Sequence, residues 1–227
     1  MVLHTDYPCH PGNYQRGRAQ PVSFLVCHYV GASGGAEANA RYYHNTPNLS
    51  ASAHYFVDHA PGAGVWVSVA EADTAWHCGA KTYRHPACRN ANSIGIEMCC
   101  HQRPDGTWYI DEETMVAAAE LGRDIMARYK ISLENVLRHY DVTGKLCPRP
   151  LVDEGAWADF KKRLEAEEEM TYYKTIGDVP ADYRPAVQKL LDKGALKGYG
   201  DGTIQVSEDL CRTAVILDRL GLVKGDA

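Results

Sequence analysis

The sequence has 227 residues, of which 45% are hydrophobic and 23% are charged, as is typical of folded globular proteins. This length suffices for one full domain and a smaller one, and it excludes a peptide that needs disulfide staples. The formal net charge is -5 and no run of Lys and Arg forms a basic stripe, so we expect no nucleic-acid partner.

Neither a membrane segment nor a secretory signal is expected. No apolar run approaches the roughly 20 residues of a membrane helix, and the start, MVLHTDYPCH, lacks the basic and apolar regions of a signal peptide. We therefore expect synthesis in the cytoplasm and no membrane partner. In a reducing compartment the eight cysteines are expected to be free thiols or metal ligands, although Cys78 and Cys88 could bridge a loop.

Four short runs predict the strands of a buried sheet. Residues 21–30, PVSFLVCHYV, carry apolar side chains on both alternating faces, which is typical of a strand covered on both sides. His28 then lies near the end of a core strand. Three further β-branched or aromatic runs are bounded by Pro, Gly and Asn, at residues 51–59, 64–70 and 92–100.

Helical spacing is clearest at residues 112–130, where Asp111 is placed to cap a helix. Another helix is expected at residues 36–45, and residues 133–139 predict a short strand or turn that leads to His139. The apolar faces expected are Met115, Ala118, Ala119, Gly122, Ile125, Met126 and Tyr129 in the long helix, and Trp157, Phe160 and Leu164 in a closing helix.

The charged run EAEEEM divides the chain into a domain of residues 1–168 and a smaller domain of residues 169–227. In the smaller domain a helix-like stretch ends at Gly194, the turn GYGDGT follows, and a second helix begins at Ser207. The expected fold is α/β, a mixed central β-sheet flanked by helices, plus a small, mainly α-helical C-terminal domain. The residues of the last helix expected to face inward are Leu210, Ala214, Leu217 and Leu220.

The segment RHYDVTGKLCPRP, residues 138–150, places His139 and Cys147 close together without helical or strand periodicity. Imidazole and thiolate are typical zinc ligands, and a catalytic zinc has three protein ligands and an open position for water. His28 is the candidate third ligand, because a histidine in a strand of valines and phenylalanine has little other reason to be there. Taken singly, each residue is better interpreted as a hydrogen-bonded core histidine or a buried apolar cysteine.

Together with SIGIE at residues 93–97, these motifs resemble those of the type 2 N-acetylmuramoyl-L-alanine amidases, a family that includes phage endolysins and peptidoglycan recognition proteins. The resemblance covers residues 21–164. It implies the mixed-sheet fold of that family and an enzyme that hydrolyses the amide between N-acetylmuramic acid and L-alanine in peptidoglycan. It also implies one catalytic zinc ion, held by His28, His139 and Cys147.

The resemblance assigns further catalytic roles. Glu97 matches the general base, and an unpaired carboxylate between Ile96 and Met98 would otherwise be costly to bury. Lys145 matches the basic residue beside the last ligand and would face the oxyanion of the attacked carbonyl. Zinc lowers the pKa of a bound water to about 7, which makes a nucleophile available near neutral pH.

The assignments around the substrate are more open. His77 and Asn92 match positions near the substrate groove of relatives, and ordinary loop capping is the alternative for both. Some members carry a catalytic tyrosine where this sequence has Ala53. Tyr55 is a candidate substitute that would bind substrate, or it is a core side chain. Asp141 is expected to order the ligand loop.

The C-terminal sequence, from IGDVP through GYGDGT to DLCR, resembles a single S-layer-homology repeat. That resemblance implies binding to secondary cell-wall polymers. Because such repeats usually occur in threes, self-association into a homo-oligomer is the alternative.

Two functions of different classes remain. The first is a peptidoglycan amidase that reaches the cell wall after lysis, as a phage or prophage endolysin does. The second is a noncatalytic protein that binds muropeptides in the same groove; recognition-only members of the family lose the cysteine ligand, so Cys147 favours the enzyme. A third interpretation is a zinc hydrolase of the same fold that acts on another amide, or a wall-targeting scaffold in which the C-terminal domain matters most.

Overall fold

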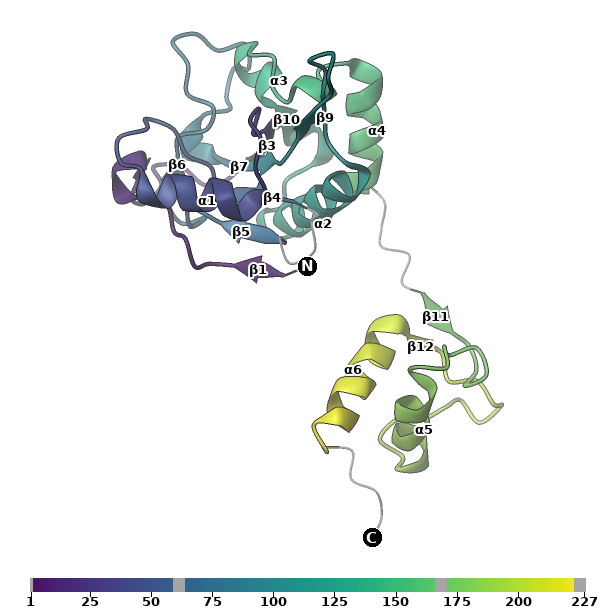
Figure 1. Ribbon diagram of the computed structural model, residues 1–227. Coiled ribbons are helices and arrows are strands. Elements are labelled where there is room, and N and C mark those ends of the chain that lie inside the picture. The colour runs from purple at the N-terminus through teal and green to yellow at the C-terminus, as the bar shows by residue number, and fades with distance from the viewer. Residues whose placement is uncertain (1, 59–63, 166–170, 223–227) are drawn as a thin grey trace. The chain divides into compact units, whose positions relative to one another are not determined.

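The computed structural model describes residues 2–58, 64–165 and 171–222 (Figure 1). The chain divides into two compact units, Met1–Ala166 and Glu167–Ala227. Each unit has a hydrophobic core of its own. The boundary expected between residues 168 and 169 lies outside the described residues.

Six strands form the central sheet of the first unit (Figure 1). The inner strands β4, β7 and β3 and the edge strand β10 run parallel to their neighbours in this group, whereas β5 runs antiparallel to β4 and parallel to β1. The sheet is therefore mixed, which confirms the fold class expected from the sequence. In spatial order the strands are β1 (Leu3–His4), β5 (Val65–Val67), β4 (Tyr55–Val57), β7 (Ser93–Met98), β3 (Phe24–Tyr29) and β10 (Val136–Arg138).

One face of this sheet lies against α2 (Glu112–Tyr129) and α4 (Glu154–Glu165) (Figure 1). Side chains alternate between the faces of a strand, so every second residue of the central strands contributes to this layer. The apolar face expected for the long helix is confirmed at its centre, where small residues let the helix approach the sheet. The buried residues of this core include Leu25, Ile94, Ile96, Met98, Ala118, Ala119, Ile125, Trp157, Phe160 and Leu164.

The opposite face of the sheet carries the candidate site residues His28 and Glu97, which lie at paired positions of β3 and β7. It is covered by α1 (Ala36–Asn45) and by α3 (His139–Thr143) together with the irregular chain between Cys78 and Cys88. Phe24 and Val26 of β3 pack in this layer. His28 has the same parity along β3, so it points to this face as well.

The remaining short elements extend from these layers. Asp111 occupies the cap position of α2 as expected, but its side chain makes no capping hydrogen bond and its carboxylate instead pairs with His101 Nε2 at 2.8 Å. The further elements of the first unit are β2 (Tyr14–Gln15), β6 (Thr74–Ala75), β8 (His101–Gln102), β9 (Trp108–Tyr109), and the 3-10 turns Pro11–Asn13, Asn90–Asn92, Leu133–Asn135 and Arg149–Leu151.

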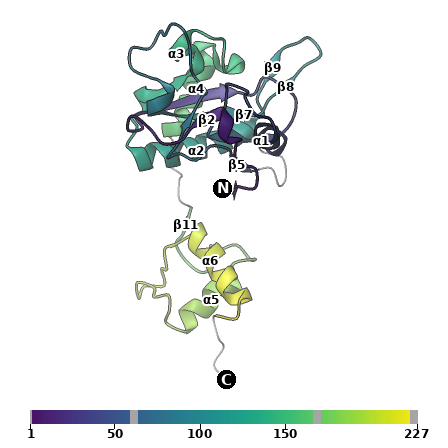
Figure 2. The same ribbon diagram turned by 90° about the vertical axis from the view of Figure 1, so that its left-hand side faces the viewer.

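The second unit pairs two helices, α5 (Arg184–Asp192) and α6 (Glu208–Arg219), which lie side by side (Figure 2). A two-stranded ladder of β11 (Tyr172–Tyr173) and β12 (Val206–Ser207) completes it. Ser207 caps α6 as expected, because its Oγ accepts a hydrogen bond from the N–H of Leu210 at 3.2 Å.

The inward face predicted for α6 is wrong at two positions. Leu210 is 36% exposed and Leu220 is 66% exposed, whereas Cys211 and Ala214 are fully buried. Small side chains at Cys211 and Ala214 fill the contact between the helices, which turns the larger leucines outward. No helix in the described ranges has both the length and the apolar character that a membrane crossing requires.

Candidate metal centre

His28 and Glu97 are neighbours on two parallel strands. β3 and β7 pair in register so that His28 lies opposite Glu97, and side chains at paired positions point to the same face of a sheet. His28 is only 1% exposed. Its Nδ1 lies 3.9 Å from Oε1 of Glu97. The sheet register alone therefore brings an imidazole and a carboxylate together at one point.

The other neighbour of β3 supplies two more candidate ligands. β10 ends at Arg138, so α3 begins with His139 beside the end of β3. The chain then turns at Gly144, whose φ of 86° is in the left-handed region that favours glycine, and it returns to Cys147. The N–H of Tyr140 donates to the Cys147 carbonyl at 2.8 Å, which closes this turn.

Asp141 stabilises the start of α3. Its Oδ2 accepts from the backbone N–H of Arg138 at 2.8 Å, and its Oδ1 accepts from Nη2 of the same guanidinium at 2.7 Å. Arg138 is 4% exposed and also donates to the carbonyl of Val152 at 2.9 Å. These bonds tie the turn that carries His139 to the chain that follows Cys147.

Three donor atoms converge at the centre. One ligand atom each from His28, His139 and Cys147 lies within 4.8 Å of the other two, and all three residues are buried. The Sγ of Cys147 is 3.6 Å from Nδ1 of His28, and the two imidazole rings are 4.8 Å apart between centroids. This spacing is close enough for one small ion to contact all three atoms.

Unsatisfied polar atoms indicate that the centre fits a metal. Among the described residues, Nδ1 of His139 and Oε2 of Glu97 are buried without a hydrogen-bond partner. A buried polar atom without a partner is costly, so such atoms usually face a ligand, an ion or water. Two imidazoles and a thiol are borderline to soft donors, which suit zinc and leave its fourth position open.

A chain of hydrogen bonds assigns the tautomer of His28. Ser93 Oγ donates to the carbonyl of Arg89 at 2.7 Å, so it accepts from Nε2–H of His77 at 3.0 Å. Nδ1 of His77 is then free to accept from Nε2–H of His28, also at 3.0 Å. This assignment, made from the direction of the hydrogen bonds, leaves a lone pair on Nδ1 of His28, the atom that faces Cys147.

The space for His77 depends on Gly95. A Cβ at this position would lie 2.6 Å from Cγ of His77, closer than real contacts allow. The same strand residue donates its N–H to Nδ1 of His54 at 3.0 Å. His54 is fully buried and its ring lies 5.6 Å from that of His77. Gly95 therefore leaves space for the ring of His77 and donates a hydrogen bond to His54, and both histidines lie behind the candidate ligands.

Burial keeps both candidate imidazole ligands neutral near pH 7. Desolvation holds the pKa of His28 well below its usual range, and unfavourable electrostatic interactions with the neighbouring His77 and His139 add to the effect. Desolvation, assisted by Lys145, lowers the pKa of His139 to about 4. A neutral imidazole is the form that binds a metal, so these groups are ready to act as ligands.

Burial acts in the opposite direction on the acidic groups. It raises the pKa of Cys147 to about 12 and that of Glu97 to about 8, and the positive charge of Lys145 opposes both shifts. The Glu97 side chain is 20% exposed, so it reaches the surface of the centre. A divalent cation here would favour the ionised thiolate and carboxylate.

Not every residue proposed from the sequence reaches the centre. Tyr55 pairs with Ile96 in the sheet, so it points to the face opposite that of Glu97, and its hydroxyl donates to Glu71 at 2.6 Å. Asn92 caps the loop before β7, because its Oδ1 accepts from the N–H of Arg89 at 2.7 Å and its Nδ2 donates to the Ala87 carbonyl at 3.1 Å. Lys145 is exposed on the turn before Cys147, and His77 lies behind His28.

A pocket of about 430 Å³ opens beside Glu97. Its lining combines polar groups and aromatic rings from α1 with residues that follow β3, and sequence reasoning did not single these out. The helical spacing of residues 36–45 could have indicated them, since Asn39, Tyr42 and Tyr43 share one stretch of that helix. The lining residues are Val30, Ala32, Ser33, Ala38, Asn39, Tyr42, Tyr43, Phe56 and Glu97.

Comparisons with known proteins show which families the two parts of the chain are similar to. The sequence profile of the N-acetylmuramoyl-L-alanine amidase family matches residues 18–150, and that of the S-layer homology domain matches residues 172–210. The chain is 35% identical, over 156 residues, to a probable N-acetylmuramoyl-L-alanine amidase of Bacillus licheniformis. The match covers 64% of this chain and 42% of that protein, so it spans less than half the length of the relative.

Solved structures show the same fold. The catalytic domain of XlyA superposes with a TM-score of 0.58 and 29% identity, over 72% of this chain and 99% of that domain. A mutant endolysin from Bacillus subtilis gives a TM-score of 0.57 and 28% identity, over 72% and 98%. Because the family profile covers more than half of the sequence and includes both strands and ligand turns of the centre, the chain belongs to the N-acetylmuramoyl-L-alanine amidase family.

Proposed function

We propose that this protein is a zinc-dependent hydrolase that cleaves the amide between N-acetylmuramic acid and L-alanine in peptidoglycan. The observation that carries the proposal is the convergence of His28, His139 and Cys147 within 4.8 Å beside a carboxylate with a raised pKa. Membership of the amidase family supports the choice of bond. The open fourth position of a zinc ion held by these residues would supply Lewis-acid activation of water and of the amide carbonyl.

Glu97 is suited to move the protons of this reaction. Its carboxylate lies beside His28, and its Oε2 has no partner among the described residues. It would take a proton from the attacking water and deliver that proton to the nitrogen of the leaving L-alanine. A carboxylate whose pKa is raised toward neutrality by burial, and lowered again by a nearby cation, can do both.

Lys145 is suited to stabilise negative charge at the carbonyl oxygen. It lies two residues before Cys147 and its charge acts on Glu97 and His139. As the tetrahedral intermediate forms, the former carbonyl oxygen gains charge, and a cation held at that place lowers its energy. The pocket lined by Asn39, Tyr42 and Tyr43 would hold the muramoyl or peptide part of the substrate.

The products of digested cell walls test this proposal. Purified sacculi treated with the zinc-loaded protein should release new L-alanine amino termini without new reducing sugar ends. New reducing ends would indicate a glycosidase. Binding to sacculi without either product would indicate a noncatalytic recognition protein, which is the alternative function. Another amide product would indicate a hydrolase of the same fold with a different substrate.

We also propose a biological role for this activity. We propose that the protein acts at the bacterial cell wall as an endolysin, and its similarity to an endolysin of Bacillus subtilis supports this role. Expression inside a bacterium together with a pore-forming protein should cause lysis, whereas expression with Glu97→Gln should not. Lysis by the variant would show that wall cleavage is not the cause.

We propose that the second unit binds a secondary cell-wall polymer, as its S-layer homology match supports. The chain ending at Glu168 keeps the buried residues Trp157, Phe160 and Leu164 of α4, so its core stays complete. This shorter chain should still cleave wall fragments but sediment less with intact walls. Equal sedimentation of both forms, with dimers or trimers of only the full chain in ultracentrifugation, would indicate self-association instead.

A further inference from the structure

The fold brings the thiols of Cys78 and Cys88 together in one small core cluster. Both residues are fully buried, and each thiol shifts the pKa of the other. They share a small core cluster with Phe24 and Val26 beneath the face of β3 that carries His28. No role in the proposed hydrolysis falls to either thiol, although both are held close together by the fold.

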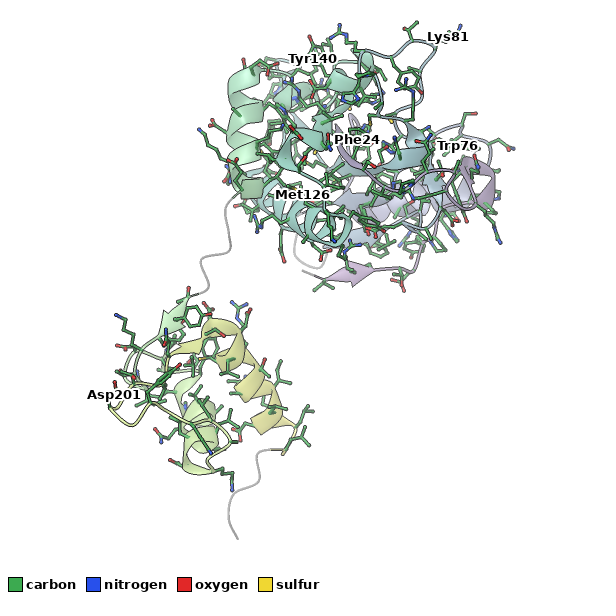
Figure 3. All side chains as sticks on the ribbon, turned by 180° about the vertical axis from the view of Figure 1, so that it is seen from behind. Phe24, Trp76, Lys81, Met126, Tyr140 and Asp201 are labelled. Carbon is green, nitrogen blue, oxygen red and sulfur yellow. The ribbon has the colours of Figure 1, made fainter. Side chains whose placement is uncertain are left out.

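The chain between the two cysteines is an exposed segment with both ends fixed. Residues 79–87 contain no helix or strand, and Figure 3 shows Lys81 at its outer end. The N–H groups of Arg84 and His85 both donate to the carbonyl of Val142 in α3, at 2.9 and 3.2 Å. The guanidinium of Arg84 lies 4.8 Å from the ring centre of Tyr140, in the same helix.

This segment is connected to the supports of two candidate ligands, His28 and His139. At one end Cys78 follows His77, which supports His28. In the middle the segment holds α3, the helix that begins with His139. A covalent bond between Cys78 and Cys88 would therefore close an 11-residue loop around the supports of two candidate ligands.

We propose that Cys78 and Cys88 are a modification site, a dithiol that a low-molecular-weight disulfide oxidises to an intramolecular disulfide. Cys78 and Cys88 share one small buried cluster, so little movement brings their thiols to bonding distance, which distinguishes this pair from isolated buried cysteines. The interaction with Cys88 lowers the pKa of the Cys78 thiol, whereas the same interaction and burial raise the pKa of Cys88. Cys78 is thus the nucleophile and Cys88 the resolving thiol.

The reaction proceeds by two exchanges. Cys78 Sγ attacks one sulfur of the small disulfide, breaks its S–S bond and releases one small thiolate, which leaves a mixed disulfide on Cys78. Cys88 then loses its proton and attacks Cys78 Sγ, which releases the second small thiolate. Two protein thiols are oxidised and one small disulfide is reduced to two thiols. Local opening of residues 79–87 admits the reagent to the buried pair.

Differential alkylation of the full chain tests the proposal. The reduced protein is equilibrated with glutathione disulfide and glutathione at stepped ratios, either folded or refolded from urea in the same buffer. It is then quenched in acid, alkylated and digested with trypsin. Cleavage after Lys81 and Arg84 separates the two cysteines into peptides 42–81 and 85–89. We expect these peptides to be linked by a disulfide, with two fewer alkylated cysteines per chain.

Two controls make the result specific. Cys99 and Cys100 are also buried and adjacent in sequence, and they should stay alkylated in the same digest. The Cys88→Ser variant should give no linked peptides, and at most a glutathione adduct on Cys78. Separate alkylation of Cys78 and Cys88 in the refolded chain, under oxidising ratios, would overturn the proposal.

Thermal unfolding provides a second readout. Closing the loop should raise the Tm of the first unit by roughly 5 °C, and dithiothreitol should reverse the rise. The Cys88→Ser variant should show no such difference between the two buffers. A disulfide that formed but lowered the Tm would show that the native geometry does not accommodate it, and would also overturn the proposal.

Discussion

Nε2–H of His28 donates a hydrogen bond to Nδ1 of His77 across 3.0 Å, and this bond decides which nitrogen of His28 is left for a metal. The direction of this bond depends on Ser93. Its hydroxyl donates to the Arg89 carbonyl and therefore accepts from Nε2–H of His77, which leaves Nδ1 of His77 as an acceptor. Residues that are not themselves candidate ligands thus determine which nitrogen of His28 is available to a metal.

Removing the hydroxyl of Ser93 tests whether these hydrogen bonds fix the tautomer of His28. In Ser93→Ala, Nε2–H of His77 loses its acceptor, so both tautomers of His77 and His28 become accessible. We expect zinc affinity to fall about 10-fold to 100-fold while the protein stays folded. Competition with a chromophoric chelator measures the affinity. Ser23→Ala, which changes an exposed hydroxyl elsewhere, is the matched control and should leave it unchanged.

A single methyl group added at position 95 tests how closely the His77 ring packs against β7. In Gly95→Ala the new Cβ would overlap the His77 ring, so the ring or the strand must shift. We expect a loss of about 1–3 kcal/mol in the free energy of unfolding, together with weaker zinc binding. Gly177→Ala has only ordinary contacts and should change stability by less than about 0.5 kcal/mol. Urea unfolding measures the stability of both variants. A Gly95→Ala variant as stable as the unaltered protein would contradict the close packing of His77 against Gly95.

Replacing the proposed general base should separate chemistry from binding. Glu97→Gln keeps the shape of the side chain but cannot accept the proton, so we expect amine release from sacculi to fall about 10²-fold to 10⁴-fold. Zinc content and Tm should stay near those of the unaltered protein. Glu113→Gln, an exposed change on α2, should retain full activity. An active Glu97→Gln enzyme would remove this residue from the mechanism.

Acid should destabilise the fold through His54. Burial holds the pKa of His54 well below its usual range, and unfavourable electrostatic interactions with the neighbouring His77 and Arg18 add to the shift. Below pH 6.5 the unfolded chain therefore binds a proton that the folded chain excludes, so stability is full above that pH and falls as the pH drops. The slope for one proton is about 1.4 kcal/mol per pH unit.

The variant His54→Asn isolates this contribution from those of other titrating groups. Its amide oxygen can still accept from the N–H of Gly95, but it does not titrate. Between pH 6.5 and pH 5 the free energy of unfolding should fall less steeply in the variant than in the unaltered protein. Urea unfolding at several pH values measures both slopes, and identical slopes would show that His54 is not the group responsible.

The local sequence pattern was sufficient to predict strands β3, β4, β5 and β7 and the three candidate metal ligands. His28 stands out in an apolar strand, and His139 and Cys147 share one irregular segment. The buried faces of the long helix follow from its period. The order of the motifs resembled one family, which supplied the grouping that single residues do not. The order of the strands, with β3 beside β10, then explains why the candidate ligand atoms of His28, His139 and Cys147 lie within 4.8 Å of one another.

Contacts that depend on register and packing could not be predicted in this way. Ser93 and Gly95 act on His77 because β7 places them beneath its ring, and no local signal in the sequence indicates that. Tyr55 points away from Glu97 because it pairs with Ile96 rather than with Glu97 itself. Leu210 turns outward because the contact between α5 and α6 is filled by smaller side chains.

X-ray absorption at the zinc edge tests the central claim most directly. Protein loaded with one equivalent of zinc should show one sulfur neighbour at about 2.3 Å and nitrogen or oxygen neighbours at about 2.0–2.1 Å. Cys147→Ser should lose the sulfur signal, whereas Cys99→Ser should keep it. A spectrum without sulfur in the unaltered protein, or an unchanged sulfur signal in Cys147→Ser, would contradict a centre built from His28, His139 and Cys147.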